Sequence, residues 1–164
     1  YEHANLGSNL RMTGWQAAIL IAQMERFDEQ LQRRMSNARR LNAILEEIDG
    51  LQPMHWDERA DNHAFHLYMM RYDAQGFAGL SRNRFVEALR AEGVPCSTGY
   101  ARPLYRQPPL TDLYSRIMPC PVSEKACQEA IWLTQNMLLA EPEQIDRIAE
   151  AIVKVKENVE SLKG

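Results

Sequence analysis

The chain has 164 residues, of which 45% are hydrophobic and 25% are charged, so it holds enough apolar material for one globular domain or a large piece of a bigger protein. Its net charge of −3 argues against nucleic acid as the main partner, because a phosphate backbone needs a basic surface. No apolar run approaches the roughly 20 residues that span a bilayer, and we therefore expect no membrane partner.

The first predicted element is one long helix over residues 13–48. Thr13 suits the N-cap and Gln16 follows three positions later, as in a capping box. Apolar residues then recur every three or four positions, and Gly50 is a plausible stop. At 1.5 Å per residue the helix would be roughly 50 Å long, which is long for a compact domain of this size. Such a helix usually packs on another domain or subunit.

The rest of the chain alternates short strands with helices. In chain order we first predict a loop over 51–62, a strand over 64–72, and a helix capped by Ser81 and ended by Gly93. A short strand over 94–98 and a loop over 99–109 follow. The chain then continues with helices over 111–118 and 124–130 (the second capped by Ser123), a strand over 131–134, and a last helix from Pro142. This order predicts an α+β fold, in which a small antiparallel sheet packed with helices is preceded by one long N-terminal helix.

Metal ligands and nucleophiles are scarce. His63 and His66 lie three apart at the start of a predicted strand, where they would point to opposite faces, so no metal site is predicted. The three cysteines lack C-x-x-C spacing, which favours a reduced, cytoplasmic protein, and the polar first residues predict no signal peptide. Cys96 precedes a loop, where a thiol can be exposed, and Cys120 and Cys127 look structural. We expect the cysteines to be small packed side chains and none of them to be catalytic.

The residues just before the long helix could hold an anion. A glycine-containing turn over 7–12 leads into a helix N-terminus, where free backbone N–H groups converge. Asn9 adds a side-chain donor and Arg11 adds positive charge. Taken by itself, the same segment also reads as an ordinary loop and cap.

The lysines restrict the chemistry further. The chain has only four, Lys125, Lys154, Lys156 and Lys163, and all fall in predicted helices of the last quarter. Each has the character of a solvated surface residue. An enzyme that uses a lysine aldimine would therefore need its lysine elsewhere.

The sequence resembles one known family at specific motifs. Residues 7–18 fit G-x-N-x-R-M-T-x-x-Q-A-A, and residues 99–105 fit G-Y-x-x-P-L-Y. Both are similar to segments of DegT/StrS-type aminotransferases, which are fold-type I enzymes that use pyridoxal 5'-phosphate (PLP). Further similar stretches at 23–26, 63–68, 77–82 and 120–127 extend the resemblance over essentially the whole chain.

The resemblance implies roles for four residues and a division of the chain. Asn9 would reach the PLP phosphate of the neighbouring subunit of a homodimer, and Arg11 would assist with phosphate or substrate. Tyr100 and Tyr105 would border the substrate site, in a form closer to the branch that handles cyclitols and aminohydroxybenzoate-type products. Residues 1–49 would form an interdomain segment and connecting helix, and residues 50–164 the small C-terminal domain.

The resemblance also implies what this segment lacks. In the family the aldimine lysine lies upstream, in an N-terminal PLP-binding domain, so we expect no catalytic residue in this chain and no activity from it alone. The complete enzyme would move an amino group from glutamate or glutamine to a keto-sugar or cyclitol. Two alternatives stay open, namely a PLP-dependent sugar dehydratase of the same fold and a non-catalytic dimerisation or binding module. If the long helix lacks its partner domain, self-association is expected.

Overall fold

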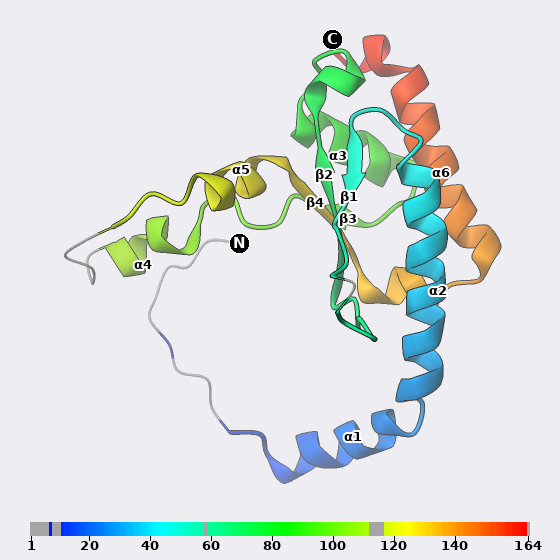
Figure 1. The fold of residues 1–164 in the computed structure, drawn as a ribbon, viewed down its shortest axis with the longest axis vertical. Helices are drawn as coiled ribbons and strands as arrows, with labels where there is room; N and C mark the ends of the chain where they lie inside the picture. The colour runs from blue at the N-terminus through cyan, green and yellow to red at the C-terminus, as the bar shows by residue number, and fades with distance from the viewer. Residues whose placement is uncertain (1–6, 8–10, 58, 112–116, 164) are drawn as a thin grey trace.

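The computed structural model describes residues 7, 11–57, 59–111 and 117–163. They form an α+β fold in which helices α2, α3 and α6 cover one face of a small sheet (Figure 1). The predicted fold class is confirmed. Among the described residues, none of the helices combines the length and the apolar character needed to cross a bilayer.

The predicted single N-terminal helix is divided in two. Helix α1 (Gly14–Met24) ends at a turn, and α2 (Phe27–Leu45) continues in another direction (Figure 1). The break lies at Arg26, whose backbone has φ −107° and ψ 2°, and no glycine or proline marks it. At this turn the Arg26 N–H bonds the Gln23 carbonyl, three residues back, at 3.2 Å; beyond it α2 packs into the core, whereas no residue of α1 is buried.

The sheet has four antiparallel strands in the order β1-β2-β4-β3. The central pair is β2 (Leu67–Tyr72) and β4 (Ala130–Thr134), with β1 (Leu51–Pro53) and β3 (Cys96–Ser97) at the edges. The register pairs Tyr68 with Leu133 and Met69 with Trp132. Because side chains alternate along a strand, Tyr68 and Leu133 face the helices, whereas Met69 and Trp132 face the other side.

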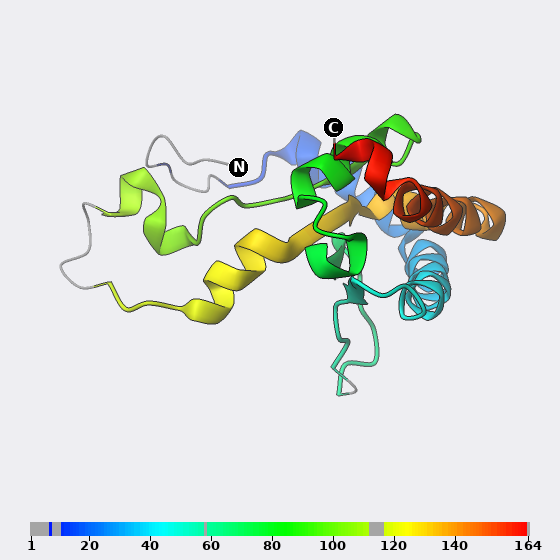
Figure 2. The same ribbon diagram turned by 90° about the horizontal axis from the view of Figure 1, so that it is seen from above.

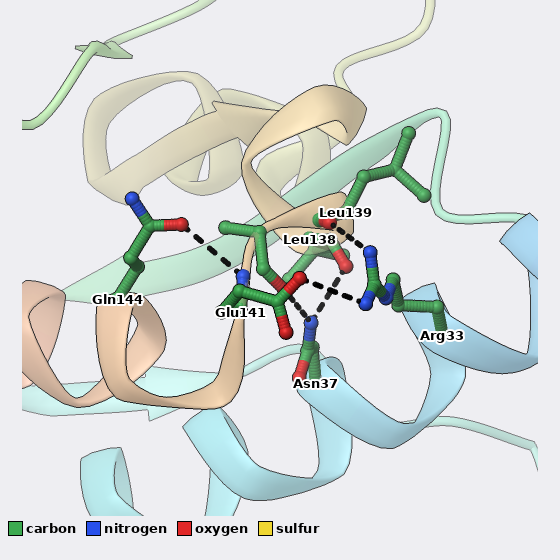
Figure 3. A network of polar contacts seen from close by, with 7 residues as sticks. Arg33, Asn37, Leu138, Leu139, Glu141 and Gln144 are labelled. Atoms are coloured by element: carbon green, nitrogen blue, oxygen red, sulfur yellow. Dashed lines mark hydrogen bonds and ion pairs between the residues drawn. The ribbon is translucent and has the colours of Figure 1, made fainter.

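The helical layer consists of α2, α3 (Arg82–Ala91) and α6 (Pro142–Glu157). Their inward residues are fully buried against the sheet and include Leu41, Leu45, Phe85, Leu89, Ile145 and Ile152. A seam of polar contacts also fixes α2 beside the segment that leads into α6 (Figure 3). There the buried Asn37 donates to the carbonyls of Leu138 and Ala140, each at 2.9 Å, and Arg33 reaches Glu141 at 3.0 Å.

Several predicted boundaries change. The predicted loop over 51–62 contributes β1, and the strand predicted from 64 begins at Leu67, because Phe65 has φ +48°, outside the range of a strand. The helix predicted over 111–118 is wrong at both described ends. Thr111 closes helix α4 (Pro108–Thr111), and Met118 is not helical; residues 112–116 lie outside the described part.

Helix α5 (Pro121–Glu129) begins before the predicted Ser123 cap, since Pro121 occupies its first turn. The caps predicted for α3 and α6 are confirmed: Ser81 accepts from the Arg84 N–H, Gly93 follows with φ +88°, and Pro142 opens α6. The remaining short turns are 3₁₀ helices, η1 (Ala74–Phe77), η2 (Leu104–Arg106), η3 (Gln135–Leu139) and η4 (Val159–Leu162).

Candidate functional site

An open cleft of about 480 Å³ lies on the face of the sheet opposite the helical layer. Met69 of β2 and Trp132 of β4 form its floor, and the loop over 99–106 and helix α5 form its walls. These two walls extend from the sheet on the side away from α2 and α6 (Figure 2). The volume lies within the range of small-molecule sites, which makes this cleft the candidate site.

Gly99 shapes the entrance of the loop. Its φ is +68°, a left-handed conformation that favours glycine, and the Trp132 ring packs directly on it. A Cβ at this position would lie only 2.6 Å from the ring. Tyr100 then meets Trp132 edge to face, with centroids 6.1 Å apart. The first residues of the loop are therefore held by the strand beneath them.

The far end of the loop is attached to α5 by a second set of contacts. The Tyr105 hydroxyl donates to Glu124 Oε1 at 2.5 Å and accepts the Cys120 N–H at 3.2 Å. Arg106 donates to the same Glu124 oxygen at 2.7 Å. The Glu124 carboxylate also lies in the first turn of α5, where the helix dipole favours negative charge. Tyr105 thus lines the cleft while its hydroxyl joins the two walls.

The predicted site residues fall into two groups. Tyr100 and Tyr105 both line the cleft. Arg11 is exposed near the start of α1 and is not part of that lining, so the structure does not bring it together with the tyrosines within one chain. Asn9 lies outside the described residues.

Backbone N–H groups at the start of α1, beside Arg11, are hydrogen-bonded by side chains of the same segment. Thr13 is the N-cap as predicted, its hydroxyl accepting from the Gln16 N–H while Gln16 Oε1 accepts from the Thr13 N–H at 2.8 Å. This capping box is confirmed. It occupies the Gln16 N–H group, so an anion here would depend mainly on residues 7–11 and on the neighbouring N–H groups of the first turn.

The four lysines do not fit a covalent PLP site. Lys125 and Lys154 are exposed and form ion pairs with Glu129 and Glu92. Lys156 donates to the Asp49 carbonyl at 2.6 Å, and Lys163 pairs with Glu160. None of the four lines the cleft. The residues present therefore supply no Schiff-base lysine beside the candidate site, and no chemical step through PLP follows from them.

The prediction of packed cysteines is confirmed for Cys96 and is wrong for Cys120. Cys96 is buried, because strand β3 turns its side chain toward the core beside the Val86 carbonyl, and burial raises the pKa of its thiol. Cys120 is exposed at the start of α5, and Cys127 is half-buried at the cleft. Within the described ranges, no three His, Cys, Asp or Glu side chains gather as a metal site, and His63 Nδ1 instead accepts the Phe65 N–H.

Of the residues that line the cleft, sequence reasoning predicted Tyr100 and Tyr105. It missed, among others, Met69 and Trp132, and it also missed Glu124, which binds Tyr105. Strand alternation could have placed Met69 and Trp132 on one face, opposite to Ile131 and Leu133. No sequence pattern predicts that Glu124 meets Tyr105, because that contact depends on where the sheet brings α5.

Comparison with known proteins identifies the family to which the chain is similar. The DegT/DnrJ/EryC1/StrS aminotransferase family model matches residues 1–153. The chain is 35% identical to the putative L-glutamine:3-amino-2,3-dideoxy-scyllo-inosose aminotransferase of Streptoalloteichus tenebrarius, over 99% of this chain and 44% of that protein. It is 30% identical to the 3-amino-5-hydroxybenzoate synthase of Amycolatopsis mediterranei, over 93% of this chain and 40% of that protein.

Solved structures agree on the fold. The crystal structure of 3-amino-5-hydroxybenzoic acid synthase superposes with a TM-score of 0.73 at 29% identity, over 94% of this chain and 41% of that one. DesI superposes with a TM-score of 0.77 at 19% identity, over 96% of this chain and 39% of that one. The chain therefore spans about two fifths of the length of the relatives it matches.

Proposed function

Because the chain belongs to the DegT/DnrJ/EryC1/StrS aminotransferase family, we propose that it is the C-terminal part of a PLP-dependent aminotransferase that aminates a keto-sugar or cyclitol. The observation that carries the proposal is the family match over residues 1–153. The names of the relatives, which are L-glutamine:inosose aminotransferases and an aminohydroxybenzoate synthase, support glutamine as the donor and a ring ketone as the acceptor.

The parts of this chain would take different tasks in the complete enzyme. Residues 50–164 would be its small domain, and residues 1–49 the connection to a PLP-binding domain, with α2 packed on the small domain. Helix α1 is largely apolar and has no buried residue, which is the character of a helix that another part of the protein covers. The cofactor, when bound, would stabilise the carbanion of transamination.

This chain's own residues would bind rather than react. Asn9 and Arg11 would hold the PLP phosphate of the partner subunit in a homodimer, and Tyr100 and Tyr105 would border the acceptor. The rigid attachment of the loop at Gly99 and Glu124 supports a positioning role, because a site held by a strand and a helix keeps its geometry. The catalytic lysine would come from outside these residues, so the isolated chain is inactive.

The test compares this chain with the complete protein. Each is incubated with PLP, reduced with borohydride and mapped by peptide mass, and each is assayed with L-glutamine and a keto-cyclitol. We expect one labelled lysine and amine formation from the complete protein, and neither from the isolated chain. Stoichiometric labelling of Lys125 or another of the four lysines would contradict the proposal that the catalytic lysine lies outside these residues. Absence of transamination in the complete protein would overturn the function.

A further inference from the structure

Helix α5 forms one wall of the cleft, yet none of its residues is buried. A helix of this kind gains little from hydrophobic packing, so polar contacts must decide where it lies. Near its start, Glu124 accepts hydrogen bonds from Tyr105 and Arg106 of the opposite wall. At its other end, α5 is contacted by Arg82 of helix α3.

Arg82 lies at the end of its own helix where a positive charge is unfavourable. It is the first residue of α3, directly after the Ser81 cap, and the first turn of α3 holds no acidic residue to offset the helix dipole. The side chain is half-buried, and its Nη1 donates to the Cys127 carbonyl at 2.7 Å and to the Ala130 carbonyl at 3.0 Å. Burial lowers the pKa of Arg82, because its charge is partly withdrawn from water. Arg82 therefore contributes to another element rather than to the start of α3.

The C-terminal end of α5 requires such a group. The last four carbonyls of a helix have no partner within the helix, and this end carries partial negative charge. The last turn of α5 has no basic residue of its own. Cys127 belongs to that turn, and Ala130 is the residue at which α5 ends and β4 begins. Arg82 thus caps α5 from a different helix and holds the junction between α5 and β4.

From this geometry we propose that Arg82 is a positioning residue that fixes α5 as the wall of the cleft. Arg82 is not part of the cleft lining, so it would act through α5 and not by contact with a bound molecule. Because α5 also carries Glu124, which binds Tyr105, a displaced α5 would disturb both walls together. The consequence for the amino acceptor rests on the proposed function. The capping of α5 does not, since it needs neither PLP nor the missing lysine.

Amide hydrogen exchange of this chain, measured on peptic peptides by mass spectrometry, reports how often each element opens. One peptide covers α5, and a reference peptide covers β2 at the centre of the sheet. Arg82→Met removes the donor and keeps an apolar side chain of similar reach. We expect exchange in α5 to accelerate by about tenfold and exchange in β2 to stay within about twofold of the native chain. A residue that only stabilised the whole fold would accelerate both peptides by the same factor.

Two further variants separate the cap from a general loss of an arginine. Arg82→Lys keeps a charged donor near the end of α5 and should recover part of the lost protection. Arg90→Met is the matched control, because Arg90 lies on the same helix and donates to a backbone carbonyl of β3, that of Cys96, at 2.8 Å. It should leave exchange in α5 unchanged. Native exchange of α5 in Arg82→Met, equal acceleration of α5 and β2, no recovery by lysine, or an equal effect of Arg90→Met on α5 would each overturn the proposal.

Kinetics of the complete protein test the consequence for the acceptor. Arg82→Met should raise the KM for the keto-cyclitol by about tenfold and change kcat by less than about twofold, because a displaced wall weakens binding and carries no reacting group. An unchanged KM together with faster exchange in α5 would overturn the link between Arg82 and the acceptor. If the native complete protein does not transaminate, the proposed function fails, and the exchange experiment still decides the capping role.

Discussion

The Trp132 ring closes over Gly99 so tightly that a Cβ on the glycine would lie 2.6 Å from Cζ3. This contact joins strand β4 to the loop that carries both tyrosines of the candidate site. Because Gly99 also has φ +68°, it combines two requirements for glycine at one position, a left-handed backbone and a close approach.

Gly99→Ala should therefore destabilise the chain by about 2–4 kcal/mol, as the sum of backbone strain and overpacking against Trp132. Gly93→Ala is the matched control, since Gly93 has φ +88° but no atom within 4 Å of the position that a Cβ would take. It should cost only about 1 kcal/mol. Urea unfolding of both variants measures the difference, and equal losses would show that the Trp132 contact contributes nothing.

The contact between Tyr105 and Glu124 should be measurable as a coupling. Tyr105→Phe removes the donor of this hydrogen bond and Glu124→Ala removes its acceptor, so the double variant should lose less stability than the sum of the two single variants. A coupling energy of about 1 kcal/mol is expected from a double-mutant cycle of urea unfolding. Strict additivity would mean that the loop and α5 are not joined by this bond in solution.

Acid should weaken the attachment of α6 to α2. Arg40 binds Asp146 through two hydrogen bonds of 2.6 and 2.7 Å, which hold the pKa of that carboxyl below its ordinary value of 3.8. A depressed folded pKa gives stability that is fully present above pH 3.8 and is lost as the pH falls through the folded value. Asp146→Asn should therefore be less stable than the native chain above pH 3.8. The difference in stability between the two proteins should shrink as the pH falls below that value.

Thermal unfolding across this pH range checks the effect of Asp146→Asn. Asp61→Asn is the control, because Asp61 is an exposed acid that forms no ion pair with any described residue. A pH profile of Asp146→Asn parallel to that of the native chain would contradict the role of the Arg40 pair.

The three thiols should react in the order of their exposure. Cys120 is exposed and should be modified first; Cys127 is half-buried and should follow; Cys96 is buried and should react only on unfolding. Burial raises the pKa of both Cys96 and Cys127, which lowers their thiolate fractions further. Iodoacetamide labelling followed by peptide mass mapping gives the order. Cys120→Ser should remove the fast phase alone, and early modification of Cys96 would contradict its burial.

Helix α1 should drive self-association of the isolated chain. Trp15 is 85% exposed and Ile21 is 69% exposed, on a helix with no buried residue. Apolar surface of this kind associates in water. Ile19→Glu with Ile21→Glu should shift the chain toward monomer in sedimentation velocity. Val122→Glu, which changes a still more exposed residue of α5, should not. A native chain that sediments as a monomer would refute this expectation.

Local signals in the sequence determined those helix ends that carry capping residues. Thr13 with Gln16, Ser81, Gly93 and Pro142 each act through neighbours a few residues away, so their caps could be predicted from the sequence. The hydrophobic period likewise determined the buried stripe of α6, and the α+β class followed from the order of the elements. The motifs at 7–18 and 99–105 were sufficient for the resemblance to the family.

The sequence did not mark the break between α1 and α2, and only the tertiary structure decided the composition of the cleft. The apolar period of residues 13–48 runs through Arg26 without a glycine or proline, so no local pattern predicts the turn there. Met69, Trp132 and Glu124 are far apart in sequence, and the β2–β4 register and the placement of α5 bring them to one cleft. Such contacts depend on long-range packing, to which no local pattern of residues is sensitive.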